Sequence, residues 1–213
     1  MSTILEYHAK NKHTLSTNFI YGIRKHLFAQ EGKGMYLRDA CKIVTTYGDP
    51  LERDCPGNVE IPNVYDIASN AFNNEDTMRA AAEFRTKSYY KCDTIEDIKA
   101  ALCNYGPILA SVKWFNDYKV VKGVLTGGES KEYGYHAIVI YGYNKEGFLC
   151  QNSWGRTWGN NGRFILPYEI KIKEARGLVD MENTVYISPK KPGGLWNLLY
   201  KFLNMFINLF RAD

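Results

Sequence analysis

The sequence predicts an α+β protein with two lobes, one helical and one rich in strands. Its 213 residues, 45% of them hydrophobic and 14% aromatic, suffice for one or two domains with sizeable cores. In the first half the hydrophobic residues recur with the spacing of amphipathic helices, whereas in the second half they form short continuous runs typical of buried strands. Helices followed by strands, rather than alternating with them, favour separate α and β layers.

Helices are expected throughout the first half. One covers residues 2–10, and another runs to Phe28 from Ser16, which is a good N-cap residue. A third, near residues 37–47, ends at a Gly-Asp-Pro sequence that is unfavourable to helix. A loop rich in Pro, Asn and Gly is expected over residues 48–64.

The pattern changes after one more pair of helices. A helical stretch is expected around residues 76–85, and Thr94 opens a capping box with Asp97 at the start of a helix that ends at Asn104. Beyond Gly106 the hydrophobic residues are contiguous, as in buried strands. The expected strands cover residues 108–115, 136–143, 147–152, 163–166 and 184–187.

Charge and cysteine content exclude several classes of protein. A net charge of +4 without basic clusters argues against nucleic acid as a partner. The five cysteines form no Cys-x-x-Cys pair and are too few and too far apart for a zinc knuckle or a disulfide framework, so no metal is expected. The first eight residues lack the basic and apolar regions of a signal peptide. The default expectation is a cytoplasmic or membrane-associated location.

Of the four histidines, only His136 stands in a chemical context. It is expected to open a strand, and Asn152 ends the returning strand sixteen residues later. Two antiparallel strands joined by a short turn bring these ends together, so His136 and Asn152 are predicted neighbours. An amide oxygen that accepts the imidazole N–H forms half of a Cys-His-Asn site, and Trp154 would shield that bond from water. The same spacing also fits a purely structural hairpin.

The blocks around these two residues resemble a known family. Residues 136–143 (HAIVIYGY) and 151–162 (QNSWGRTWGNNG) are closely similar to the His and Asn blocks of papain-like cysteine peptidases, HAVxxVGY and NSWGxxWGxxGY. The stretch through Thr94–Val112 resembles the helix and strand that lead into the family's second lobe. Residues 34–56 resemble the family's divergent bacterial and viral branch. The resemblance covers roughly residues 1–188.

This resemblance implies a fold and a set of roles. The fold would be the two-lobed papain-like architecture, a helical lobe beside an antiparallel, β-barrel-like lobe. His136 would be the general base, Asn152 would orient it, and Trp154 would shield the pair. The reaction would be hydrolysis of a peptide or protein substrate, without metal or cofactor. Tyr135 is bulky where many relatives carry a small residue, and it either narrows the cleft or packs against the loop at residues 127–132.

The nucleophilic cysteine that the resemblance implies is missing from the 213 residues. In the family the histidine follows that cysteine by about 130–150 residues, and residues 1–6 contain no cysteine. Thr3–Tyr7 resembles the interior of the family's central helix, which would place the nucleophile about five residues before Met1. The oxyanion-hole glutamine would lie earlier still, so the fold is expected to be truncated at its N-terminus. The cysteines that are present are expected to be buried structural residues.

The C-terminal tail is expected to be a separate amphipathic helix. Twelve of the sixteen residues in Leu195–Phe210 are apolar or aromatic, and the four others share one helical face. Such a helix is about 24 Å long, short of a hydrocarbon core of roughly 30 Å. It would lie in a membrane surface, dock onto the body or a second copy, or fill a partner's groove. The expected parts are residues 1–93 (helical lobe), 94–188 (β lobe), 189–194 (linker) and 195–213 (tail).

Two functions of different classes stay open at this point. The first is a papain-like cysteine peptidase, inactive as these 213 residues because the nucleophile and the glutamine are absent. The second is a non-catalytic papain-like binding or scaffold module, tethered to a membrane by the tail. A third idea is that another chain supplies the missing segment in trans.

Overall fold

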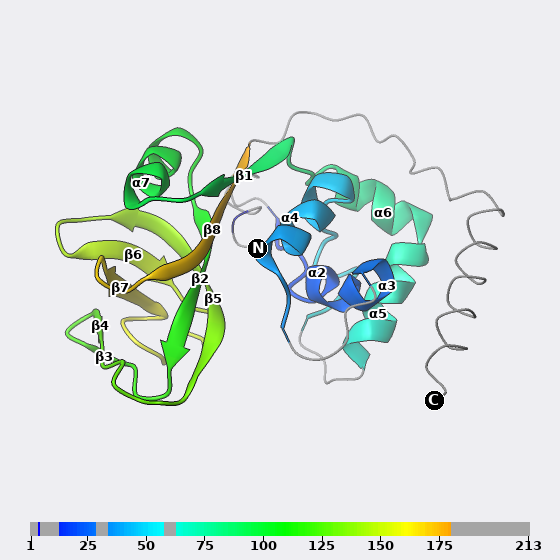
Figure 1. Cartoon of the computed structure of the whole chain (residues 1–213). Coiled ribbons are helices and arrows are strands. Elements are labelled where there is room, and N and C mark those ends of the chain that lie inside the picture. Colours follow the sequence, from blue (N-terminus) through cyan, green and yellow to red (C-terminus); the bar gives the residue numbers. More distant parts are fainter. Residues whose placement is uncertain (1–3, 5–12, 29–33, 58–62, 180–213) are drawn as a thin grey trace, which may run out of the picture.

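The computed structural model describes Ile4 and residues 13–28, 34–57 and 63–179. Figure 1 shows most of the helices gathered on one side of the molecule and a large sheet on the other, which confirms the predicted α+β class. Apart from Ile4, the helix predicted over residues 2–10 lies outside the described residues. The strand predicted over residues 184–187 and the tail helix lie outside them as well.

The helical lobe forms because hydrophobic residues recur every three or four positions and turn one face of each longer helix to a common core. The predicted helices at residues 37–47 and 76–85 correspond to α4 and α6. Sequence analysis missed α5, whose buried residues Val64, Ala68 and Ala71 have helical spacing but follow a segment expected to be loop. The helices of this lobe are α2 (Phe19–Gly22), α3 (Arg24–Phe28), α4 (Leu37–Thr46), α5 (Asn63–Asn73) and α6 (Glu75–Ala82).

The prediction of one helix from Ser16 to Phe28 is wrong, first in its starting point. The helix begins at Phe19, and Ser16 anchors the preceding segment to a loop. The Ser16 hydroxyl donates to the carbonyl of Cys55 at 2.6 Å and accepts the backbone N–H of Phe19 at 2.9 Å. Because that hydroxyl is engaged with a residue 39 positions away, the chain turns here before the helix starts.

The same prediction is also wrong about continuity, because the helix is interrupted at Ile23 between α2 and α3. Arg24 is fully buried, and its guanidinium turns back to donate to the Tyr21 carbonyl at 2.8 Å. That carbonyl would otherwise accept a helical N–H four residues later. The guanidinium also donates to the Tyr65 hydroxyl at 3.1 Å, so a buried cation joins α3 to α5.

The β lobe is one eight-stranded sheet in the order β1-β8-β2-β5-β6-β7-β4-β3. Neighbouring strands are antiparallel except β4 and β7. Sequence analysis missed β1, β3, β4 and β8, because two are only three residues long and the others mix apolar with polar or charged residues. The strands are β1 (Ser88–Cys92), β2 (Ile108–Phe115), β3 (Lys119–Val121), β4 (Val124–Thr126), β5 (Tyr133–Tyr143), β6 (Gly147–Gln151), β7 (Arg163–Pro167) and β8 (Ile172–Val179).

The central strand β5 starts earlier than predicted. His136 was expected to open this strand, but the strand begins at Tyr133, so His136 lies three residues inside it. The cause is pairing with β2, in which Gly134 lies opposite Trp114 and Tyr133 opposite Phe115. The segment just before His136, which includes Gly134, is thus part of the strand rather than a loop.

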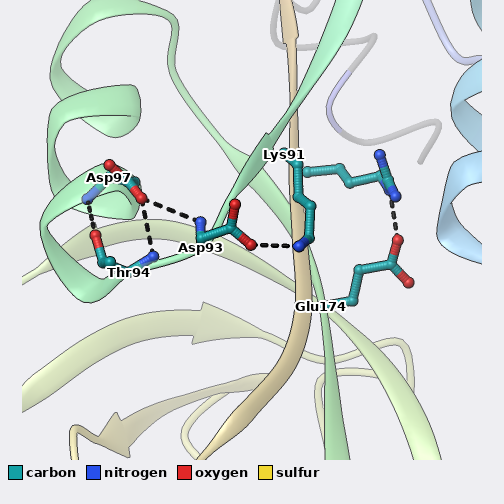
Figure 2. A network of polar contacts seen from close by, with 6 residues as sticks. Lys91, Asp93, Thr94, Asp97 and Glu174 are labelled. Carbon is teal, nitrogen blue, oxygen red and sulfur yellow. Dashed lines mark hydrogen bonds and ion pairs between the residues drawn. The ribbon is translucent and has the colours of Figure 1, made fainter.

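Helix α7 (Ile95–Asn104) packs on β1, β2 and β5, and its predicted capping box is confirmed. The Thr94 hydroxyl accepts the N–H of Asp97 at 3.0 Å, and the Asp97 carboxylate accepts the N–H of Thr94 at 2.9 Å (Figure 2). These bonds hold the pKa of the Asp97 carboxyl below its usual range. Figure 2 also shows the ion pair of Lys91 with Asp93, which joins the end of β1 to this cap.

Two hydrophobic cores meet through the strands that face the helices. Leu109 of β2 and Leu178 of β8 are buried in the core of the helical lobe, together with Cys41 and Ile43 of α4. The other side of the sheet forms a second core with α7. The lobes therefore share side chains, and the sheet that carries His136 is held against the helices.

We expect Leu109→Ala to lower the free energy of unfolding by about 2–5 kcal/mol, because it leaves a cavity in the core that joins the lobes. Urea unfolding followed by circular dichroism measures this loss. The control is Val121→Ala on β3, where the side chain is exposed and the expected change is within about 0.5 kcal/mol. An equal, small effect of both substitutions would contradict a shared core.

Candidate active site

The hairpin of β5 and β6 brings His136 and Asn152 together. Asn144 makes the turn between the strands, its side-chain oxygen accepting the N–H groups of Glu146 and Gly147. Asn152 follows β6 directly, and its backbone N–H donates to the Gly162 carbonyl at 2.9 Å. His136 Nε2 lies 2.8 Å from Asn152 Oδ1, so the structure places the two predicted residues in hydrogen-bond contact.

The tautomer of His136 follows from the partners of the Asn152 side chain. The backbone N–H of Ser153 donates to the same Oδ1 atom at 2.7 Å, which identifies that atom as the acceptor oxygen. His136 Nε2 must therefore carry the proton of this bond. This leaves Nδ1 with its lone pair and without a hydrogen bond to the described part of the chain, which is the arrangement of a general base.

Burial favours the neutral form of the His136 imidazole. Desolvation lowers the pKa of His136, and the hydrogen bond to Asn152 opposes that effect by favouring the charged ring. The net direction of the pKa shift is downward, which favours the neutral imidazole, the form that can accept a proton.

Aromatic side chains enclose the histidine ring. The centroid of the Trp154 ring lies 4.6 Å from that of His136 with an interplanar angle of 34°. Trp154 therefore lies where sequence analysis placed it, although it is 46% exposed. Trp114 of β2 contacts His136 with an edge-to-face geometry at 4.9 Å and 68°. The sequence did not predict Trp114 as a neighbour of His136, because their contact depends on the pairing of β2 with β5, which no local sequence pattern indicates.

One hollow is lined by His136, and a second is lined by its neighbours Tyr135 and Ala137. The first, of about 390 Å³, lies beside the ring and is lined mainly by aromatic residues, including Trp114, Trp154 and Tyr118. The second is a groove of about 790 Å³ between the lobes, where α4 faces β2, β5 and β8. Tyr135 is 62% exposed and lines both hollows, and its ring contacts that of Tyr133.

None of the five cysteines is placed to react with His136. Four are buried in the two cores, and burial raises the pKa of Cys41 to about 12, that of Cys55 and of Cys92 to about 11, and that of Cys150 further. Cys103 is exposed, but its sulfur lies 3.7 Å from the hydroxyl of Tyr143. Tyr143 is seven residues along β5 from His136, a separation of roughly 23 Å at 3.3 Å per residue.

Within the described segments, no group of three or more His, Cys, Asp or Glu side chains is arranged to hold a metal ion. No helix in those segments has the length and hydropathy needed to cross a bilayer.

Comparison with known proteins decides the family. The model of the papain family of cysteine proteases matches residues 12–186. The chain belongs to this family. His136 and Asn152 both lie within the matched residues.

Individual relatives agree with this membership. An uncharacterized peptidase C1-like protein of Acanthamoeba polyphaga mimivirus is 29% identical over 189 residues, which cover 80% of this chain and 58% of the relative. A cathepsin B-like cysteine proteinase of Caenorhabditis elegans is 27% identical over 152 residues, 68% of this chain and 39% of the relative. This papain-family chain thus spans less than two thirds of the length of these relatives.

The fold has a close counterpart among solved structures. The crystal structure of xylellain, a cysteine protease from Xylella fastidiosa, superposes with a TM-score of 0.69 at 18% sequence identity. The match covers 85% of this chain and 77% of xylellain. At this identity the comparison shows the papain-like fold.

We expect opposite shifts of the pKa of His136 from two substitutions of its partner. Asn152→Ala removes the acceptor that favours the charged ring and should move the titration of His136 to lower pH. Asn152→Asp puts a carboxylate there and should move it to higher pH. NMR titration of the ¹⁵N-labelled imidazole measures both, with Asn73→Ala on the surface of α5 as control. Shifts of the same sign would mean that burial alone governs this histidine.

Proposed function

We propose that this chain supplies the base and its orienting residue in a cysteine peptidase that cleaves peptide bonds through an acyl-enzyme. The observation that supports this most strongly is the bond from His136 Nε2 to Asn152 Oδ1, which leaves Nδ1 available to take a proton. The groove between the lobes, which is lined by Tyr135 and Ala137 on either side of His136 in the sequence, offers a place where an extended peptide could bind.

The chemistry assigns each residue one task. His136 Nδ1 takes the proton of a cysteine thiol, and the thiolate attacks the carbonyl carbon of the substrate. The peptide C–N bond breaks as the imidazolium returns the proton to the leaving amine. Water then attacks the thioester with His136 again as base, and the carboxylic acid product leaves with the thiol restored. Asn152 holds the ring in the correct tautomer throughout, and Trp154 limits the access of water to their bond.

The thiol is the part of this apparatus that the described residues do not place. We propose that it comes from a cysteine on a segment beyond these 213 residues, in the same polypeptide or in a second chain. The burial of four cysteines and the remote position of the fifth support this. The same observations also favour a second candidate function, a papain-like module that binds peptides without cleaving them.

The expected result is that the 213-residue chain alone neither cleaves a broad fluorogenic peptide nor reacts at the cleft with an epoxide thiol probe. Fusion of an N-terminal segment with the family's glutamine and cysteine should give activity. In that form His136→Ala should lower kcat/KM by roughly 10²–10⁴-fold, because no other group takes the thiol proton. Asn152→Ala should cost less, roughly 10²-fold, because it misplaces a base that is still present.

The control is His26→Ala, which removes a histidine that packs on Phe72 in the helical lobe. It should leave activity unchanged. A folded fusion protein that binds peptide in the groove but never cleaves it would support the binding module instead. Equal losses from Asn152→Ala and His136→Ala would contradict the division of roles between them.

For the tail we propose contact with a membrane surface, on the basis of its sequence, since residues 195–213 lie outside the described residues. Its large apolar side chains would cost many kcal/mol if they were left in water, at about 25 cal/mol per Å². Lys201 and Arg211, with Lys190 and Lys191 in the linker, suit anionic head groups.

Deletion of residues 195–213 should therefore lower binding to anionic lipid vesicles in a sedimentation assay and raise solubility. The hydrogen bond of His136 to Asn152 should persist, with an unchanged NMR titration of His136. Loss of the cooperative unfolding transition on deletion would show that the tail packs against the body, and the membrane proposal would be abandoned.

A further inference from the structure

The hydrogen bond to Asn152 leaves one motion of the His136 ring unrestrained. The single hydrogen bond at Nε2 fixes the distance from this atom to Oδ1 of Asn152. It does not by itself prevent the imidazole plane from turning about the line that joins the two atoms. Such a rotation would swing Nδ1, the atom that must meet a thiol. Contacts on the ring faces and edges have to prevent it.

Trp114 is the residue best placed to prevent this rotation. Its indole meets the imidazole at 4.9 Å and 68°, a geometry favoured between aromatic rings. The same indole meets Trp154 at 5.2 Å and 81°. One side chain thus touches the base directly and also supports the second ring that covers it.

Trp114 is also more firmly held than Trp154. It is 9% exposed, whereas Trp154 is 46% exposed and lies on the loop after β6. Further contacts of Trp114 with Tyr118, Trp158 and Phe164 fix it from other sides. The position of Trp154 therefore depends partly on Trp114.

Strand register explains how Trp114 reaches the histidine. Val112 is opposite His136, and Trp114 is opposite Gly134. Trp114 is thus a diagonal neighbour of His136 on the same face of the sheet.

The charged groups of the surrounding elements are engaged elsewhere. Tyr118 and Tyr135 are the only other titratable side chains that line this hollow among the described residues. The Lys113 ammonium lies 3.7 Å from the centroid of the Tyr133 ring, and the Asp117 carboxylate accepts the N–H of Gly128. The Arg156 side chain lines a different hollow. A substitution of Trp114 would therefore mainly change how far aromatic rings bury His136.

We propose that Trp114 is a positioning residue for His136, whose indole fixes the plane of the imidazole about its hydrogen bond to Asn152. The catalytic meaning of this role rests on the proposed function. The physical claim does not, because the orientation and protonation of His136 are measurable without a thiol. Failure of peptidase activity would therefore leave the proposal about Trp114 intact, and the reverse also holds.

The test is a ¹⁵N NMR titration of the histidines in the full 213-residue chain, with the His136 signal assigned by its loss in His136→Gln. In the unsubstituted chain the Nε2–H tautomer should dominate the neutral form. Trp114→Ala should move the titration midpoint to higher pH, because water reaches the ring, and should mix the two tautomers. Trp114→Phe should restore both readouts toward the original, because it keeps an aromatic wall.

Phe164→Leu is the matched control, since Phe164 packs on Trp114 and Trp158 in the same cluster and makes no ring contact with His136. It should leave midpoint and tautomer unchanged. If Trp114→Ala does not fold, Trp114→Leu keeps apolar volume without a flat ring and should still mix the tautomers. A folded Trp114→Ala or Trp114→Leu chain with the original midpoint and pure Nε2–H tautomer would overturn the proposal.

Discussion

The pairing of β5 with β2 on one side and β6 on the other is the constraint on which the candidate site depends. The β5–β6 hairpin brings Asn152 to His136, and the β2 register sets Trp114 beside the same ring. Three residues from three parts of the chain thus meet at the strand that carries the histidine. A slip of one residue in either pairing would turn these side chains to the opposite face of the sheet.

That strand is held in place by the contact between the lobes. Leu109 and Leu178 are part of the sheet but are buried in the helical core, and α4 packs directly on β8. The groove between the lobes therefore has walls from both of them, with Tyr36 and Ala40 on one side and Tyr135 and Ala137 on the other. A peptide in this groove would contact both lobes, which suits the recognition of an extended chain.

The surroundings of His136 favour its neutral form. Burial lowers the pKa of His136, and no charged side chain lines the hollow beside it among the described residues. A thiolate in contact with Nδ1 would favour the charged ring by several tenths to a few kcal/mol. The proposed peptidase would therefore switch its histidine from neutral to charged when the thiol is seated, while the aromatic rings keep water away.

Local sequence alone determined the parts of this protein whose contacts are close along the chain. The capping box at Thr94, helices α4 and α6, and the proximity of His136 to Asn152 across a short turn follow from spacings of a few residues, and the Asn152–Gly162 block indicated the family.

Tertiary structure decided the rest. Trp114 reaches His136 through strand pairing, and the buried Arg24 donates to Tyr65, 41 residues away. β8 mixes charged with apolar residues, and its place between β1 and β2 is fixed by pairing with strands distant in the sequence. Such contacts join residues that are distant in the sequence, and local propensity does not determine which distant residue a side chain contacts.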